Sequence, residues 1–329
     1  MAKVLKRGKI PDVQINVVKT TPKTGSTMRP ADWVVIGKAV MELCEAGCDG
    51  IVVTHGTDTL SYTAAALSFM VQALPIPVIV TGSTINGKFR NSDAYNNLRN
   101  SIIAATSDLA EVCIVFSVSE IGNDALIIRG TRSREIRPTK LNAFASISVP
   151  PIGMVRGDRA MLNQGIQFRK RSDCRPTFYG SFNPAVSLIR FYPSITTAHV
   201  EDLLKASAGA VIEGYGSGQI LADAYILKAL SRFPGPIALT KPGIVYDYQE
   251  VQLHPETKAA ESAIARFQTP VSRLISLIRP QRSVLSIPSI IPVQDMLAEV
   301  ALVKLMWILG NGLEPRKSFK KSYCGEINL

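Results

Sequence analysis

The segment "IVVTHGTDTLSYTAAALSF", residues 51–69, changes character twice within nineteen residues. It opens with three β-branched apolar residues, which are typical of a short buried strand. Three threonines, a histidine and an aspartate follow, and then a run of small and apolar residues that favours a helix. Because α/β folds bind ligands at the carboxyl ends of their strands, the segment predicts a β–α unit with a candidate site at its turn.

The rest of the chain repeats this alternation of short apolar runs and helix-length segments. This order predicts an α/β fold with a mainly parallel sheet covered by helices on both faces, plus a smaller α/β domain at the C-terminal end. Residues 152–183 break the pattern because they are rich in Arg, Gly, Pro and Gln. We therefore expect domains at 1–151 and 184–329, joined by a connection at 152–183. The expected strands are 13–18, 50–53, 77–80, 112–117, 186–191, 209–213 and 237–240, with a hairpin starting at 125–129; the expected helices are 30–45, 60–72, 92–105, 199–206, 221–231 and 296–309.

Composition and charge limit the class of protein. Of the 329 residues, 46% are hydrophobic and 19% are charged, which suits a globular chain with a real core. No apolar run has membrane-spanning length, the N-terminal segment lacks the apolar centre of a signal peptide, and the five cysteines show no metal-type pairing. We therefore expect a cytoplasmic protein with reduced thiols and no membrane partner.

The net charge of +11 leaves two interpretations open. A basic surface attracts RNA, a ribonucleoprotein or acidic partners, whereas lysines and arginines are also ordinary solvated surface groups. Aromatic residues are sparse between the basic ones, which favours the second interpretation. The basic stretches are residues 3–9, 129–140, 168–175 and 316–321.

The threonine cluster has a catalytic and a structural interpretation. A threonine hydroxyl is a weak nucleophile until a neighbouring group lowers its pKa or takes its proton, and Thr57 with Asp58 at a helix N-terminus fits part of that arrangement. Asp58 also suits a substrate ammonium group. Thr and Asp are also common helix N-caps, and Gly56 permits a tight turn, so for the turn alone a structural cap and a binding site are both open.

The segment "GIVVTHGTDTLSYTAAALSFM" (50–70) closely resembles the second signature of the asparaginase/glutaminase family, which includes the D subunit of archaeal glutamyl-tRNA amidotransferase. Further stretches resemble the family in the same order from about residue 28 to the C-terminus, far more than one motif. They are "MRPADW" (28–33), "PVIVTGSTINGKFRNSDAYNNLRNSI" (77–102), "IIRGTRSREIRPTKLNAFASI" (127–147), "LIRFYPSI" (188–195), "AVIEGYGSGQI" (210–220), "DMLAEVALVKLMWILG" (295–310) and "CGEI" (324–327).

The resemblance implies hydrolysis of a side-chain amide, in L-asparagine or a related small molecule, with no metal or cofactor. It implies that Thr57 is the threonine nucleophile or its relay and that Asp58 binds the substrate amine. It further implies that Ser26 binds the substrate carboxylate and that Gly56 helps to shape the pocket. His55 is interpreted as structural, without a role in proton transfer. Members of the family complete the pocket across subunits, so a homodimer or larger oligomer is expected.

Two departures from the family pattern put the chemistry in question. Family members open with a strand that ends in Thr-Gly-Gly-Thr-Ile and supplies the primary nucleophile, and the sequence resembles the family only downstream of that strand. We expect that segment to be missing, or supplied by another polypeptide or by upstream coding sequence. The similar segments "TGSTM" (24–28) and "TGSTI" (81–85) are interpreted as unrelated to that first strand. Of their residues, Thr27 is the better alternative candidate for the nucleophile. The second departure is Glu135, which stands where the family has the lysine that activates the Thr57-type hydroxyl.

Other positions differ less decisively. Lys140 and Arg134 are the candidate cations to replace the family's activating lysine, although nothing in their spacing requires either to reach the site, and Asn142 replaces the family's aspartate. Asp247, Tyr248 and Glu250 are weak stand-ins for the family's stretch that reaches across the subunit interface. Two functions are therefore expected: an asparaginase-type amidohydrolase with an incomplete site, or an inactive asparaginase-like subunit, a pseudoenzyme, that binds RNA or another assembly through its basic surface.

Overall fold

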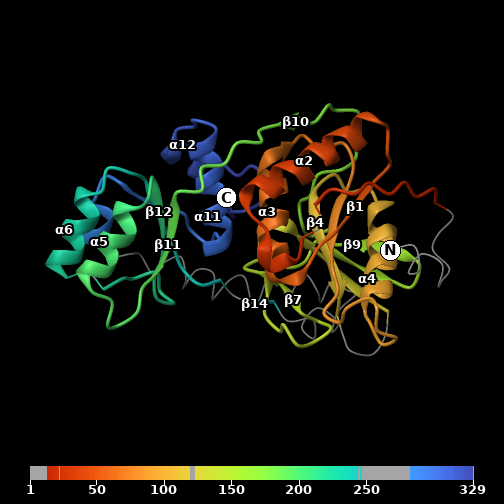
Figure 1. Ribbon diagram of the computed structural model, residues 1–329, viewed down its shortest axis with the longest axis horizontal. Coiled ribbons are helices and arrows are strands. Elements are labelled where there is room, and N and C mark those ends of the chain that lie inside the picture. Colours follow the sequence, from red (N-terminus) through yellow and green to blue (C-terminus); the bar gives the residue numbers. More distant parts are fainter. Residues whose placement is uncertain are drawn as a thin grey trace. The chain divides into compact units, whose positions relative to one another are not determined.

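The computed structural model describes residues 13–21, 23–118, 123–221, 223–243, 245–246 and 282–328. The chain divides into two compact units, Met1–Ser181 and Phe182–Leu329. Each unit combines helices with a β-sheet, as the ribbon in Figure 1 shows. The predicted α/β class with a second α/β domain is therefore confirmed. The predicted positions of Asp247, Tyr248, Glu250 and the basic stretch 3–9 lie outside the described residues.

The first unit is built on a six-stranded mixed sheet in the order β1-β3-β4-β5-β8-β9. Strands β1, β3 and β4 are parallel, and the remaining neighbours pair antiparallel. Among the described residues β1 lies at an edge of the sheet, since it pairs with β3 alone. The strands are β1 (Ile51–Thr54), β3 (Val78–Thr81), β4 (Val112–Ser117), β5 (Ala125–Arg129), β8 (Gly153–Arg156) and β9 (Arg159–Leu162).

Two parts of the first unit differ from the sequence prediction. Residues 13–18, predicted as a strand, have no strand pairing among the described residues, and Ile15, Val17 and Val18 are exposed. Their alternating β-branched pattern resembles a strand, but pairing needs a partner edge that the pattern cannot specify. Residues 153–162, predicted as part of a connection, form the antiparallel strands β8 and β9 of the sheet. Their side chains alternate between less and more exposed positions, so arginine and glycine content hid a strand pattern.

Helices cover the two faces of this sheet. Helix α4 packs against Ile79, Cys113 and Val115, which point to one face. Helix α3 is buried at every residue from Leu60 to Met70 except the half-buried Tyr62, and it contacts β3 and β4 from the other face. The helices are α2 (Pro30–Glu45), α3 (Leu60–Met70) and α4 (Ala94–Ala105); the short elements are β2 (Val71–Gln72), which pairs with β10 (Thr177–Phe178), the antiparallel pair β6 (Ser133–Glu135) and β7 (Phe144–Ile147), and the 3₁₀ turns η1 (Gly25–Thr27), η2 (Thr57–Thr59) and η3 (Gly130–Arg132).

The second unit contains a four-stranded parallel sheet in the order β11-β12-β13-β15. Helices α5 and α6 close one apolar core, and α11 contacts β11, β12 and β13. The predicted 296–309 helix is confirmed as α11, displaced by one to two residues. The elements are β11 (Val186–Arg190), α5 (Thr197–Lys205), β12 (Gly209–Glu213), α6 (Ala224–Arg232), β13 (Ile237–Thr240), β14 (Val245–Tyr246), α10 (Arg282–Leu285), β15 (Ile290–Pro292), α11 (Ala298–Gly310) and α12 (Pro315–Lys320).

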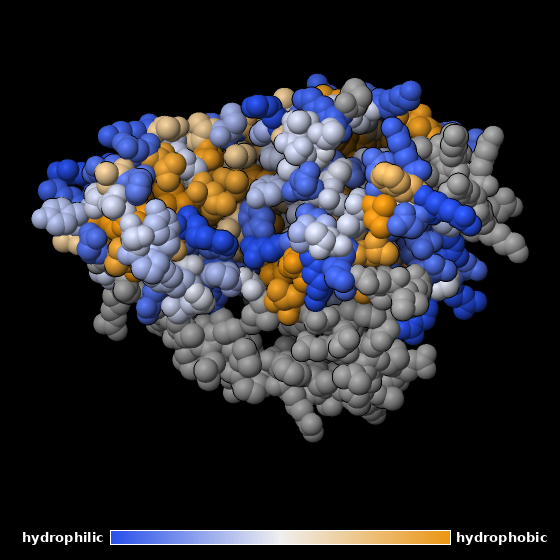
Figure 2. All heavy atoms as spheres, turned by 60° about the horizontal axis from the view of Figure 1, so that its bottom comes forward, coloured by the Kyte–Doolittle hydropathy of each residue, from blue (hydrophilic) through white to orange (hydrophobic). Residues whose placement is uncertain are grey.

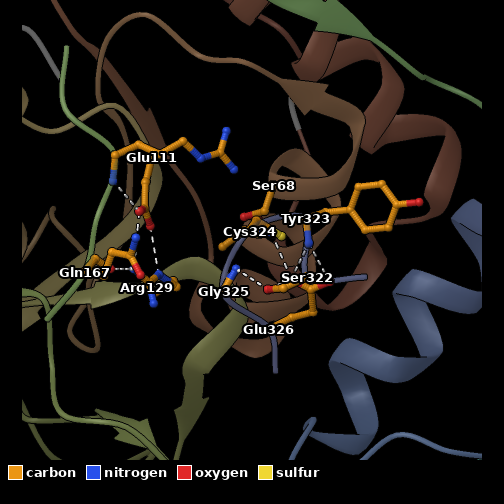
Figure 3. Close-up of polar contacts among 11 residues, drawn as sticks. Ser68, Glu111, Arg129, Gln167, Ser322, Tyr323, Cys324, Gly325 and Glu326 are labelled. Atoms are coloured by element: carbon orange, nitrogen blue, oxygen red, sulfur yellow. Dashed lines mark hydrogen bonds and ion pairs between the residues drawn. The ribbon is translucent and has the colours of Figure 1, made fainter. Parts of the chain in front are cut away.

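Several arginines of the predicted basic stretches serve the fold. Arg129 pairs with the buried Glu111 at 2.8 Å and donates to the Gln167 carbonyl oxygen at 2.6 Å, as the left part of Figure 3 shows. Arg132 is fully buried, and Arg171 donates to the Ala105 and Ser107 carbonyl oxygens. These cations hold loops onto the first unit and present less charge to a partner than the sequence count suggests.

The described surface mixes hydrophilic and hydrophobic residues, and Figure 2 shows hydrophobic side chains in patches between hydrophilic ones. Exposed apolar residues are common on globular proteins and need no special explanation when they are scattered. None of the helices in the described ranges has both the length and the apolar character to cross a bilayer.

Candidate active site

The candidate site is formed by two loops of the first unit that touch through glycines. One is the hydroxyl loop, residues 24–27, which precedes α2; the other is the β1–η2 turn, residues 54–59. A Cβ on Gly25 would lie 2.9 Å from the Gly56 carbonyl carbon, and a Cβ on Gly56 would lie 2.6 Å from the Gly25 nitrogen. Thr59 Oγ1 donates to the Gly25 carbonyl oxygen at 2.6 Å. The two loops for which the sequence analysis predicts substrate binding therefore form one surface.

We expect Gly25→Ala to destabilise this surface. The added methyl group would overlap the Gly56 backbone, which cannot move as a flexible side chain would. Overpacking of this kind costs about 1–3 kcal/mol, and urea unfolding measures it. Gly216→Ala is the matched control because no heavy atom lies within 4 Å of its added Cβ. Equal stability of the two variants would contradict the close approach of the loops.

The hydroxyl loop presents exposed Ser26 beside two threonines. Thr24 Oγ1 lies 3.3 Å from both Ser26 Oγ and Thr27 Oγ1. Thr27 Oγ1 also donates to the Thr24 carbonyl oxygen at 3.0 Å. The hydroxyl of this alternative nucleophile candidate therefore stabilises the turn that contains it. Asp32 anchors the start of α2, because it accepts from the Arg29 N–H and from Lys23 Nζ, both at 2.8 Å. The hydrogen bond from Lys23 lowers the pKa of Asp32, against the effect of burial.

Glu135 reaches the β1–η2 turn from the end of β6. The preceding η3 turn packs tightly on α3, since a Cβ on Gly130 would lie 3.0 Å from Ser68 Oγ, and Ser133 Oγ donates to Ser61 Oγ at 3.2 Å. These contacts place Glu135 close to Thr57 and Asp58, since both residues act on the pKa of its carboxyl. Glu135, which stands where the family has the activating lysine, thus lies beside Thr57 and Asp58.

The cluster of Glu135, Thr57 and Asp58 contains two carboxyl groups and no cationic side chain. Burial raises the pKa of Glu135, the negative charge of Asp58 raises it further, and the hydrogen bond from Thr57 opposes both effects. Glu135 and Thr57 are half-buried, whereas Asp58 is exposed. A threonine hydroxyl that faces two carboxylates is not stabilised as an alkoxide, because like charges repel. The arrangement instead favours binding of a cationic group.

The remaining sequence candidates have structural contacts. Thr81 is buried and donates to the Val115 carbonyl oxygen at 2.8 Å, and Asp93 accepts from the Thr84 and Ile85 N–H groups at 3.0 Å. These contacts shape the "TGSTI" loop as a closed turn. Lys140 is exposed, and its carbonyl oxygen accepts from Thr84 Oγ1 at 3.1 Å. Arg134 and Asn142 are half-buried.

Sequence reasoning missed one side-chain pair at the site. His55 Nε2 lies 2.9 Å from Thr63 Oγ1, which is fully buried in α3. The spacing of the two residues carries no recognisable motif. Among the residues that the structure describes, no three His, Cys, Asp or Glu side chains gather as metal ligands.

Comparison with known proteins agrees with this geometry. The family profile "Asparaginase, N-terminal" matches residues 2–167. The L-asparaginase of Thermococcus kodakarensis is 34% identical over 303 residues, which is 91% of this chain and 82% of that protein. The D subunit of the glutamyl-tRNA(Gln) amidotransferase of Pyrococcus horikoshii is 33% identical over 304 residues, and the match covers 91% of this chain but 64% of that protein.

Solved structures show the same similarity. The thermostable L-asparaginase from Thermococcus kodakarensis superimposes with a TM-score of 0.78 at 29% identity, over 99% of this chain and 90% of that one. L-asparaginase I from Vibrio cholerae has a TM-score of 0.71 at 25% identity, over 93% of this chain and 84% of that one. The glycine-coupled loops, the Thr57–Asp58 turn and these matches lead to one conclusion: this chain belongs to the asparaginase family.

Proposed function

We propose that this chain binds a free amino acid with a side-chain amide at the hydroxyl loop and the β1–η2 turn, and hydrolyses that amide only weakly. Asp58 holds the α-ammonium group, and Ser26 holds the α-carboxylate. Thr57 lies beside the side-chain amide as an unactivated nucleophile or relay. The observation that carries the proposal is the position of Glu135 beside Thr57 and Asp58, both of which act on the pKa of its carboxyl.

Three features support the binding half of the proposal. The β1–η2 turn leads into the N-terminal end of α3, where backbone N–H groups and the helix dipole favour a bound carboxylate. Asp58 is exposed and therefore accessible to an ammonium group. A relative at 34% identity carries the name L-asparaginase, and asparagine is an amino acid of the proposed class.

The weak hydrolysis follows from charge. A threonine attacks an amide carbonyl carbon efficiently only when its proton is removed or its pKa is lowered. A neighbouring cation lowers that pKa, whereas the Glu135 carboxylate raises it. Binding and hydrolysis are therefore expected to separate in this chain.

We expect Asp58→Asn to weaken binding of L-asparagine and L-aspartate by about tenfold or more, because a charge-assisted hydrogen bond to the ammonium group is lost. Isothermal titration calorimetry of the full chain measures this. Asp49→Asn is the matched control, since Asp49 is an exposed aspartate just before β1. Absence of binding in the wild type, or equal affinities of the Asp58 and Asp49 variants, would refute the assignment of the site.

A second candidate function is participation in a larger assembly. The observation in its favour is the match of 91% of this chain to relatives named as the D subunit of an amidotransferase, of which it spans 64%. A homodimer or a complex with another chain is the proposed state. Light scattering of the pure protein and of a native extract distinguishes the two, and a monomer in both would exclude this function. The proposed RNA or ribonucleoprotein partner stays a prediction.

A further inference from the structure

His55 connects the β1–η2 turn to the buried side of α3. Its Nδ1 lies 2.7 Å from the carbonyl oxygen of the next residue, Gly56, and its Nε2 lies 2.9 Å from Thr63 Oγ1. The His55 N–H donates to the Thr81 carbonyl oxygen of the neighbouring strand at 2.8 Å. Both the ring and the backbone of His55 are therefore held, at the residue that directly precedes the Gly56–Thr57 peptide.

These contacts determine where the ring proton lies. A carbonyl oxygen can only accept, so Nδ1 must carry the hydrogen that bonds to Gly56. In a neutral ring Nε2 is then an acceptor, and the Thr63 hydroxyl donates to it. Burial lowers the pKa of His55, against the opposing effect of the Gly56 hydrogen bond, and keeps the ring neutral at pH 7.

We propose that His55, in its Nδ1–H tautomer, is a positioning residue that aims the Gly56–Thr57 peptide and with it the Thr57–Asp58 ligand groups. The inference rests on the proposed function for the ligand, but its geometric part concerns the free protein. We call the contacts Thr63–His55 and His55–Gly56 the brace. In the brace, Thr63 on α3 fixes the His55 ring, and the ring in turn fixes the Gly56 carbonyl of the turn.

The physical link is the planarity of the peptide unit. The Gly56 carbonyl and the Thr57 N–H belong to one rigid trans peptide, so they point in opposite directions. A hydrogen bond that holds the carbonyl toward His55 therefore directs the Thr57 N–H away from the ring. Gly56 has little other freedom on this side, because the Gly25 backbone occupies the space around its Cα. The ring and the glycine contact together specify one orientation of the turn.

The side chain of Thr63 makes the brace testable by small changes. Thr63 is fully buried, and Thr63→Val keeps its shape while removing the hydroxyl donor. Without that donor, the Nε2 acceptor of the half-buried ring loses its partner, which favours a different tautomer or a turned ring. Thr63→Ser retains the hydroxyl and is the conservative variant that should restore the brace.

The experiment is NMR of the full chain with ¹⁵N-labelled histidine, first without ligand. The sequence contains three histidines, His55, His199 and His254, so the ring signals can be assigned by single substitutions. We expect the His55 ring to be neutral at pH 7 with its proton on Nδ1, and Thr63→Val but not Thr63→Ser to change that pattern. The Thr57 backbone amide signal should move in His55→Phe and stay in the control His199→Gln.

Ligand affinity supplies the second readout. We expect His55→Phe and Thr63→Val to bind L-asparagine about tenfold more weakly than the wild type, and Thr63→Ser to bind it nearly as well. A His55 ring with its proton on Nε2, or a folded His55→Phe with an unmoved Thr57 amide, would overturn the inference. A wild type that binds no amino acid would instead refute the proposed function, while the ligand-free spectra still decide the role of His55.

Discussion

The Glu135→Lys variant is expected to release ammonia from L-asparagine about a hundredfold or more faster than the wild type, because activating groups commonly contribute orders of magnitude to turnover. The substitution replaces a carboxylate that lies beside Thr57 by an ammonium group. An ammonium group beside the hydroxyl lowers its pKa and also removes the like charge that faces Asp58. Ammonia release by the purified full chain, with saturating substrate, is the measurement.

Three further variants make this result interpretable. Glu42→Lys on the exposed side of α2 makes the same change of net charge away from the site and should leave turnover unchanged. Thr57→Ala in the Glu135→Lys background should abolish the gain. Glu135→Gln removes the charge without adding a cation, so an intermediate rate is expected.

The opposite pattern would give Glu135 a different role. Robust wild-type turnover that is lost in both Thr57→Ala and Glu135→Gln would make the carboxylate a general base, since a carboxyl with a raised pKa can take a proton from a hydroxyl. The proposal of weak hydrolysis would then be wrong. If no variant releases ammonia while ligand binding is intact, the hypothesis of an inactive asparaginase-like subunit would be favoured.

Lys304→Met is expected to destabilise the protein by about 3–5 kcal/mol, the usual cost of leaving one member of a buried ion pair without its partner. Lys304 on α11 and Glu326 near the C-terminus are both fully buried, with Nζ 2.5 Å from Oε1. Nζ also donates to the Lys321 carbonyl oxygen at 2.8 Å. The Glu326 carboxylate accepts from the Tyr323 and Cys324 N–H groups, as the right part of Figure 3 shows.

The charge of Lys304 matters because the carboxylate cannot reach water. Burial raises the pKa of Glu326, but Lys304 and the backbone donors outweigh that effect and hold the pKa below its ordinary value. Methionine fills a similar volume, so the expected loss reports charge and hydrogen bonding more than packing. Urea unfolding at pH 7 measures it, with the exposed Lys320→Met of α12 as the control.

A double variant tests the cause. Lys304→Met combined with Glu326→Leu removes both charges and should recover a large part of the loss, because a buried apolar pair is often as stable as a buried ion pair. A single variant as stable as Lys320→Met, or a double variant less stable than Lys304→Met, would contradict the ion-pair explanation.

The sequence alone was sufficient for the elements whose residues face a core at regular intervals. The β-branched run 51–53 and the helix 30–45 were predicted correctly. Their local periodicity indicates which residues are buried, and Pro30 and Gly47 mark where the helix begins and ends. The same periodicity misled at 13–18 and was hidden at 153–162, since pairing depends on which edge is available. The replacement of a lysine by Glu135 was also readable, but only against the family pattern.

The tertiary structure decided which distant residues meet. Glu135 lies near Thr57 where Gly130 and Ser133 pack on α3, and the two loops of the site approach closely at Gly25 and Gly56, which lack side chains. Lys304 stands in an apolar helix pattern that carries no sign of its partner Glu326. Such contacts depend on close packing between segments far apart in the chain, and packing, unlike periodicity, is not a local property of the sequence.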